Sequence, residues 1–410
     1  MEDMAAQWPV DSPALGTRLS LEPCGRGRRE AAAPAPSPHP LACTFSGGGF
    51  RATFAALGVA RLLADLSRLG DLRYASSVSG GSVANGILAA AWPAIRDRGY
   101  STSAVDELVI DPAVRIVSSK SLKISLVKGL WRTVGPRNRT DLLARRFDEW
   151  FFGGLRLTQL DPEVRWIVNA ANLTTGVRFR FERDVFGDYT IGLLPTVGTN
   201  LRLSVAVAAS AAVPGAFAPI VLKGHAFPCG QDPPVLVDGG AYDNTGLQAL
   251  DRDKYRDVFL VSLNAGGLLR PGGYGRIPLI RELARANSLL YRQSTGLRTR
   301  MMVERFSLAR TVPAGDALPA GARRGVLVAL ATDFPAAATD ELRAWRAAYP
   351  EHRAYEGRDL SLVPTVFDKL AERLCRTLVY RGWWLTGAAL AMHWPERLPD
   401  AFESLEPPQL

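Results

Sequence analysis

The chain has 410 residues, of which 47% are hydrophobic and 22% are charged, and it carries a net charge of +9. This composition excludes a disordered or fibrous protein, because a chain of this length and hydrophobicity can bury one large core or two modest ones. The excess of cations predicts an anionic partner, and charge alone does not choose between membrane headgroups and nucleic acid.

The N-terminal residues and the apolar stretches bear on where the protein works. The chain begins MEDMAAQWPV, which is acidic where a secretory signal peptide is basic, and no apolar run follows. The most apolar stretches, residues 83–95, 201–222 and 382–394, are too short for a transmembrane helix or are interrupted by arginine or proline. We therefore expect a cytoplasmic protein, with peripheral contact to a membrane as an option.

The four cysteines, Cys24, Cys43, Cys229 and Cys375, show no CxxC spacing. This distribution favours neither a zinc site nor a disulfide framework. We expect thiols in a reducing compartment, and neither a metal nor a cofactor.

In chain order, the first elements alternate strand and helix. Residues 41–46 are an apolar run before a glycine cluster, which predicts a buried parallel strand, and residues 54–69 repeat apolar side chains at helical spacing. Residues 72–78 predict a second strand, and residues 83–95 a buried helix that stops by Pro93. Further strands are expected at residues 166–172, 177–182, 202–207, 234–237 and 258–263.

Strands separated by helical stretches indicate an α/β fold in three layers, with a mainly parallel central sheet flanked by helices. We expect a flexible N-terminal arm at residues 1–40, where residues 24–40 are low in complexity. A main domain follows at residues 41–310. A C-terminal, largely helical extension at residues 311–410 should pack on it, and its tryptophan pair, Trp383 and Trp384, is interpreted as core rather than as a membrane anchor.

A basic insertion at about residues 111–146 interrupts the main domain. Apolar residues lie between its cations, which suits an anionic membrane surface, while a solvated basic helix is the alternative. A second basic stretch covers residues 270–310. One acidic residue, Asp141, lies between the cations of the insertion. The cations are Arg115, Lys120, Lys123, Lys128, Arg132, Arg137, Arg139, Arg145 and Arg146.

The first candidate site is the glycine-rich turn Ser46-Gly47-Gly48-Gly49-Phe50-Arg51, between a predicted strand and a predicted helix. Glycines let backbone N–H groups approach a ligand, and at a helix N-terminus such donors stabilise negative charge, either a phosphate or the oxyanion of acyl transfer. The phosphate-loop patterns GxxxxGK[ST] and GxGxxG are absent here, and a simple tight turn is the alternative.

The second candidate is Ser77-Val78-Ser79-Gly80-Gly81, again between strand and helix. It approximates the G-x-S-x-G nucleophile elbow, with Ser79 at the nucleophile position and Ser77 where glycine is usual. A Ser/Gly loop that caps the next helix is the other interpretation.

The third candidate is Asp238, which ends the apolar run PVLVD and precedes Gly239 and Gly240. A carboxylate at a strand end can reach a serine at a neighbouring strand end and accept its proton as a general base. An Asx turn that closes a loop is equally compatible with Asp-Gly.

The order of these three pieces, with the small-residue and proline segment at residues 209–219, resembles the patatin-like phospholipase family. The form SGGGFRA is more similar to its cytosolic phospholipase A branch than to plant patatins. The resemblance implies a patatin-like fold over the main domain and a serine lipid acyl hydrolase that needs no cofactor. It implies the oxyanion hole at Gly47, Gly48 and Gly49.

The resemblance also implies a catalytic pair, with Ser79 as nucleophile and Asp238 as its partner in a Ser-Asp dyad. Arg51 would lie near the substrate phosphate, or it could pair with a nearby carboxylate. A dyad needs no histidine. A Ser-His-Asp site could recruit His225, but the usual α/β-hydrolase order places the histidine after the acid, so we favour the dyad.

The expected reaction is release of fatty acids from membrane phospholipids through an acyl-enzyme, with an anionic membrane surface as a further partner. A carboxylesterase or acyltransferase on the same scaffold is an alternative, as is a basic membrane- or nucleic-acid-binding protein without activity. The presence of both Ser79 and Asp238 argues against a protein without activity. The sequence does not fix the oligomeric state.

Overall fold

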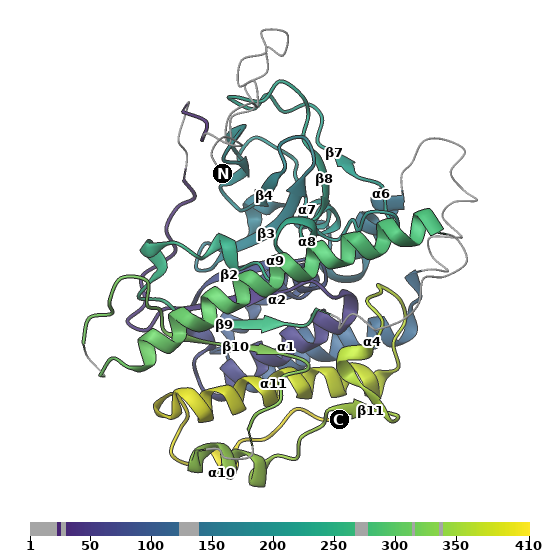
Figure 1. The fold of residues 1–410 in the computed structure, drawn as a ribbon. Coiled ribbons are helices and arrows are strands. Elements are labelled where there is room, and N and C mark those ends of the chain that lie inside the picture. The colour runs from purple at the N-terminus through teal and green to yellow at the C-terminus, as the bar shows by residue number, and fades with distance from the viewer. Residues whose placement is uncertain (1–22, 26–29, 123–138, 267–277, 314–315, 336–338) are drawn as a thin grey trace, which may run out of the picture.

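The computed structural model describes residues 23–25, 30–122, 139–266, 278–313, 316–335 and 339–410 (Figure 1). Its strands are β1 Leu41–Phe45, β2 Leu72–Val78, β3 Arg165–Asn172, β4 Val177–Phe181, β5 Val185–Asp188, β6 Gly192–Pro195, β7 Ile220–Val221, β8 Val235–Asp238, β9 Phe259–Asn264, β10 Gly325–Ala329, β11 Ala354–Tyr355 and β12 Arg358–Asp359. Its helices are α1 Gly49–Asp65, α2 Gly80–Asp97, α3 Thr102–Val105, α4 Asp111–Ser119, α6 Arg139–Phe147, α7 Leu203–Ser210, α8 Gly240–Asp243, α9 Pro278–Arg310, α10 Asp340–Ala348 and α11 Glu372–His393.

One large sheet organises the molecule, in the order β10-β9-β1-β2-β3-β4-β5-β6. The strands from β10 to β3 run parallel, and those from β3 to β6 are antiparallel. The parallel half consists of strands that are almost entirely buried, as expected when helices cover both faces. The predicted α/β sheet flanked by helices is therefore confirmed.

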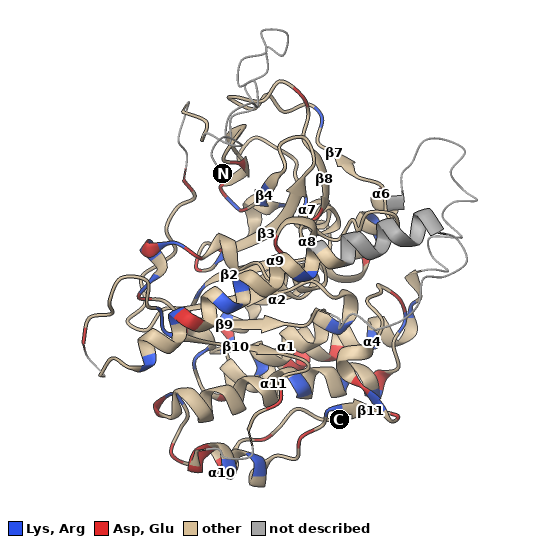
Figure 2. Ribbon diagram, viewed as in Figure 1, with Lys and Arg blue, Asp and Glu red and all other residues tan. Residues whose placement is uncertain are grey.

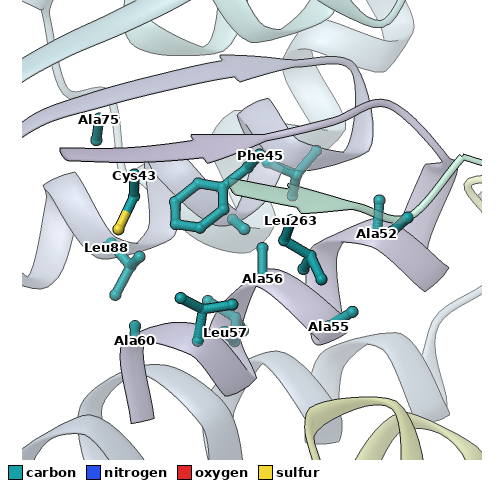
Figure 3. Close-up of a cluster of buried hydrophobic side chains, with 14 of the residues drawn as sticks. Cys43, Phe45, Ala52, Ala55, Ala56, Leu57, Ala60, Ala75, Leu88 and Leu263 are labelled. Carbon is teal, nitrogen blue, oxygen red and sulfur yellow. The ribbon is translucent and has the colours of Figure 1, made fainter. Parts of the chain in front are cut away.

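The two faces of the parallel half carry separate cores. On one face, Cys43, Phe45 and Leu263 pack against α1 and α2 in the larger core (Figure 3). On the other face, Ala42 and Leu260 pack with Met302 and Phe306 of α9. Successive residues of a strand point to opposite faces, so neighbours such as Ala42 and Cys43 belong to different cores.

The C-terminal residues are joined closely to the rest of the fold. Strand β10 pairs with β9 in the main sheet, and α11 packs along α1. The close approach of the two helices depends on glycine, since a Cβ built on Gly382 would clash with the carbonyl oxygen of Ala55, and one on Gly58 would clash with that of Val379. Trp383 and Trp384 are fully buried, in agreement with their interpretation as core.

Two of the expected elements are wrong. Residues 202–207 were expected to form a strand, but α7 covers residues 203–210, because the run continues into the strong helix former alanine and short buried apolar runs do not distinguish strand from helix. Helix α2 does not stop at Pro93 but continues to Asp97. Pro93 faces solvent while Trp92 and Ile95 are fully buried, so packing offsets the lost backbone hydrogen bond.

The expectation of four cysteines without a disulfide is also wrong. Cys24 and Cys229 form a disulfide, with their Cα atoms 6.0 Å apart, while Cys43 and Cys375 are buried thiols. The backbone N–H of Cys24 also donates to the carbonyl oxygen of Tyr189, at 2.7 Å. The two cysteines are 205 residues apart in the sequence, so motifs based on cysteine spacing cannot predict this pair. Because disulfides are typical of oxidising compartments, the cysteines no longer support a reducing cytoplasm.

The basic insertion is described only at its two flanks, α4 and α6. Lys123, Lys128, Arg132 and Arg137 lie outside the described residues. In the second basic stretch, cations recur along the described part of α9 (Figure 2). Within the part of the chain that the structure describes, no helix has both the length and the apolar character to cross a membrane.

Candidate active site

The sheet brings two strand ends together at one edge of β3. Strand β2 pairs with β3 as far as Val78, opposite Asn169, and the antiparallel strand β8 takes over at the next position, where Asp238 lies opposite Ala170. Ser79 directly follows Val78. The last residue of β8 and the first residue after β2 therefore meet, although they lie far apart in the sequence.

Ser79 occupies a strained turn between β2 and α2. Its backbone has φ 52° and ψ −119°, a region that non-glycine residues rarely adopt. The Ser79 N–H donates to the hydroxyl of Ser210 at 2.9 Å, and the N–H groups of Ser82 and Val83 donate to its carbonyl oxygen. Such a turn presents a serine hydroxyl at the end of a strand, as a nucleophile elbow does.

Asp238 is 2% exposed and lies within reach of the Ser79 hydroxyl. Burial raises the pKa of the Asp238 carboxyl to about 6, against the opposing effect of hydrogen bonds from the Ser79 hydroxyl and from the N–H of Gly240. The Gly240 bond measures 2.8 Å. The carboxylate is thus available as a proton acceptor near neutral pH, and its basicity is higher than that of an exposed aspartate.

The three glycines of the first turn are not equivalent, and Gly47 is the one that lies against Ser79. A Cβ on Gly47 would lie 3.2 Å from Cβ of Ser79, so this strand end and the elbow touch. The Gly47 N–H already donates to the carbonyl oxygen of Asn244, at 3.0 Å. The N–H groups of Gly48 and Gly49 make no hydrogen bond to any residue that the structure describes, and Gly49 begins helix α1. These two N–H groups are the available donors for an oxyanion.

The Arg51 side chain is held by main-chain carbonyl oxygens and one hydroxyl. Its side chain is 1% exposed, and its Nε and Nη2 donate to the carbonyl oxygen of Ala265 at 3.0 and 2.8 Å. Nη2 also donates to Oγ1 of Thr365, at 3.1 Å, and Nη1 donates to the carbonyl oxygen of Val363. No carboxylate of the described residues pairs with Arg51, so this one of its two expectations is wrong. Contact with a substrate phosphate stays a prediction.

Ser210, in the small-residue segment, links the other pieces. Its hydroxyl accepts from the Ser79 N–H and donates to the carbonyl oxygen of Asn169 at 2.6 Å, and its carbonyl oxygen accepts from the N–H of Gly239. Ser77 lies in the same network, since its hydroxyl accepts from Ser82 at 3.0 Å and from Asn85 at 2.9 Å. The serine in place of the usual elbow glycine is thus accommodated by hydrogen bonds.

Asn244 is a residue that the sequence analysis missed. Its side-chain Oδ1 would lie 2.7 Å from a Cβ on Gly240, and its Nδ2 3.2 Å from one on Gly266, so the amide lies among the glycine turns of the site. It follows Asp238 by six residues, directly after α8, in the run DGGAYDN. Its nearness to Asp238 in the sequence was the only signal that could have pointed to Asn244, because asparagine in a Gly-rich turn is common without any function.

Histidine does not take part in the cluster. The ring of His225 packs on Phe186, that of His352 on Tyr380, and His393 contacts Arg310. His39 lines a surface cavity near Phe259. Recruitment of His225 into a triad therefore has no support in the geometry. Among the described residues, no group of three or more potential metal ligands occurs either.

Comparison with known proteins adds to this geometry. A family model described as patatin-like phospholipase matches residues 44–251, just over half of the chain. Among solved structures, the human GIVD cytosolic phospholipase A2 in complex with methyl gamma-linolenyl fluorophosphonate is similar at 14% identity and a TM-score of 0.49. The match covers 88% of this chain and 59% of that one, so this chain spans about three fifths of the human protein.

A second similar structure is VipD from Legionella pneumophila, at 14% identity and a TM-score of 0.36, with coverage of 90% and 70% of the two chains. A search of curated protein sequences finds no match.

Proposed function

Because the chain belongs to the patatin-like phospholipase family, we propose that it is a lipid acyl hydrolase that cleaves fatty-acyl esters of membrane phospholipids. The observation that carries the proposal is the pair of Ser79, held in a strained turn, and the buried Asp238 that its hydroxyl contacts. Within the described residues, the N–H groups of Gly48 and Gly49 have no hydrogen-bond partner, and Gly49 lies against Gly80, the residue after Ser79. A nucleophile, a base and an oxyanion site are the parts that acyl transfer needs.

In the proposed reaction, Asp238 takes the proton of the Ser79 hydroxyl as the oxygen attacks the ester carbonyl carbon. The N–H groups of Gly48 and Gly49 stabilise the oxyanion of the tetrahedral intermediate. The leaving alcohol takes the proton from Asp238 as the carbon–oxygen bond breaks, which leaves Ser79 acylated. Asp238 then removes a proton from water as the water oxygen adds to the acyl carbon. The Ser79 oxygen takes that proton from Asp238 as its bond to the acyl carbon breaks, which releases the fatty acid and restores the hydroxyl.

The pKa of about 6 suits this role. A base with a higher pKa drives proton removal better, and at pH 7 a group with this pKa is still mostly ionised. The net charge of +9 favours approach to an anionic bilayer, which is where such a substrate is found.

The test compares wild type with Ser79→Ala and with Ser262→Ala. Ser262 is equally buried, but its hydroxyl accepts from Thr44 at 2.7 Å, within the sheet. We expect fatty-acid release from mixed anionic vesicles to fall by roughly 10³-fold or more in Ser79→Ala and to persist in Ser262→Ala. Labelling by an alkyl fluorophosphonate, in which the serine oxygen displaces fluoride, should mark Ser79 in wild type and be lost in Ser79→Ala.

Three outcomes would contradict the proposal. Release that survives in folded Ser79→Ala would remove Ser79 as the nucleophile. An acyl group that moves to an added alcohol rather than to water would make the protein an acyltransferase. A wild type that is neither labelled nor active on vesicles or short esters would leave a binding protein on this scaffold.

A further inference from the structure

The C-terminal segment of residues 361–368, which we name the strap, lies against the start of α1. The N–H of Phe50 donates to the carbonyl oxygen of Val366 at 3.0 Å. Gly49 has φ 62°, and a Cβ on it would lie 2.7 Å from the nitrogen of Val366, so the strap backbone covers this glycine directly. The strap thus contacts the residue that follows Gly48 in the oxyanion loop, which is defined here as Gly47–Phe50.

Arg51 joins three parts of the chain at this point. Its guanidinium donates to the carbonyl oxygens of Ser361 and Val363 in the strap and to Oγ1 of Thr365. On its other side it donates to the carbonyl oxygen of Ala265, directly after β9. A Cβ on Gly48 would lie 3.1 Å from Nη2 of Arg51. The side chain therefore fills the space between the oxyanion loop, β9 and the strap.

The far end of the strap is anchored on the flanks of the basic insertion. The ring of Phe367 packs edge-on against Phe50 at 5.4 Å and against Phe147 of α6 at 5.5 Å, between ring centroids. The Ser121 hydroxyl donates to the Asp368 carboxylate at 2.7 Å. A strap held at both ends restrains the loop that it touches.

We propose that Arg51 is a positioning residue, which clamps the strap onto the oxyanion loop so that the Gly48 and Gly49 N–H groups point at the reacting carbonyl. This inference rests on the proposed function for its catalytic consequence. It also gives the C-terminal extension a part in the active site, although the strap lies outside residues 44–251, the part that matches the family model.

The physical reason is the short reach of a hydrogen bond. Donors stabilise an oxyanion only at about 2.7–3.1 Å, and removal of one donor lowers kcat by roughly 10²–10³-fold. Three glycines in succession hold no conformation by themselves, so the loop needs external contacts. The buried Arg51, which bonds main-chain oxygens and the Thr365 hydroxyl, supplies such contacts on one side of the loop, and Val366 supplies one on the other side.

The experiment compares Arg51→Lys with Arg381→Lys in the full chain. Arg381 is a matched control, because it is also fully buried and clamps main chain, with Nη2 donating to the carbonyl oxygens of Leu330 and Thr332 at 3.1 Å. A gentler variant, Thr365→Val, removes one bond of the clamp at an exposed position. Lys369→Ala, an exposed neighbour of the strap, serves as the surface control.

Two soluble substrates separate positioning from phosphate binding: p-nitrophenyl butyrate, which has no phosphate, and monomeric dibutyryl phosphatidylcholine. We expect Arg51→Lys to lower kcat by about 10²-fold on both substrates with KM little changed, and Thr365→Val to lower it several-fold. Arg381→Lys and Lys369→Ala should keep the wild-type kcat per folded molecule. Hydrogen exchange at the peptide that contains Gly47–Phe50 should be faster in Arg51→Lys and unchanged in Arg381→Lys.

A loss confined to the phosphatidylcholine substrate would overturn the inference and make Arg51 a phosphate ligand. Equal loss of kcat in Arg381→Lys, or exchange at the loop that Arg51→Lys and Thr365→Val leave unchanged, would overturn it as well. If wild type hydrolyses neither ester, the proposed function fails, while the exchange comparison still decides whether the clamp exists.

Discussion

Helix α1 meets two different environments along its length. At its start, residues 49–51 include the buried Arg51 and lie against Gly80, in the strained turn whose Ser79 contacts the buried Asp238. Further along, at Ala55 and Gly58, it packs against α11 with apolar groups and close backbone contact only. The groups at the start of α1 destabilise the folded state but suit a catalytic site. The contacts further along stabilise the folded state and take no part in the proposed reaction.

This difference teaches how the fold supports its site. The burial of an ionised carboxylate disfavours the folded state by on the order of 1–3 kcal/mol, and so does the positive φ of a serine. The large core shared by α1, α2 and α11 offsets such terms. Substitutions in the site should therefore lower activity while they keep or raise stability. Substitutions in the α1–α11 contact should lower stability while they leave activity unchanged.

The largest effect is expected from Asp238→Asn. Loss of the general base should lower kcat by roughly 10³-fold or more. The same change should raise the free energy of unfolding at pH 7 by about 2 kcal/mol, because an amide has no charge to bury. Activity assays together with urea unfolding check both halves, and a variant that is active or less stable than wild type would refute the role given to the carboxylate.

Gly382→Ala tests the other region. The new methyl group meets the backbone of Ala55, which cannot move aside within a helix, so we expect a loss of about 2–3 kcal/mol in the free energy of unfolding. Gly296→Ala in α9 is the matched control, because its Cβ would enter open space and alanine is the better helix former.

Thermal unfolding of the two variants gives the comparison directly. Folded Gly382→Ala should keep kcat, since its defect lies away from the site. Equal stability of the two alanine variants would show that the α1–α11 contact is not close-packed.

The smallest effect concerns pH. The folded pKa of Asp238, about 6, lies above the ordinary value of 3.8. Activity should therefore fall about tenfold per pH unit as the pH drops below 6, and level off above it. Stability should change the other way: as the pH rises from about 4 to 6 the folded state binds the proton more tightly than the unfolded chain, so the contribution of Asp238 to folding becomes less favourable.

The check is the pH profile of kcat/KM beside the unfolding free energy of wild type and Asp238→Asn. The part of their stability difference that comes from the charge should vanish below about pH 3, where the carboxyl is protonated in both the folded and the unfolded state. If the difference in unfolding free energy between the two proteins does not depend on pH, it does not come from the charge of Asp238.

Much of the fold could be predicted because its signals are local. The run of residues 72–78 matches β2, the glycine turn after it matches the start of α2, and the run before Asp238 is β8. The family prediction is confirmed by the match over residues 44–251. By contrast, α7 was mistaken for a strand, because a short buried run has no polar face that would reveal its period.

The sequence by itself determined which side chains carry the proposed chemistry, since nucleophile, acid and glycine turns are each written as a few adjacent residues. Only the tertiary structure decided how they meet: β8 follows β2 along the edge of β3, Gly47 gives its N–H to Asn244, and Arg51 turns to the strap instead of to solvent. The disulfide between Cys24 and Cys229 is another feature that only the tertiary structure decided. Each is a contact between residues far apart in the chain, which depends on how whole elements pack and therefore leaves no local pattern.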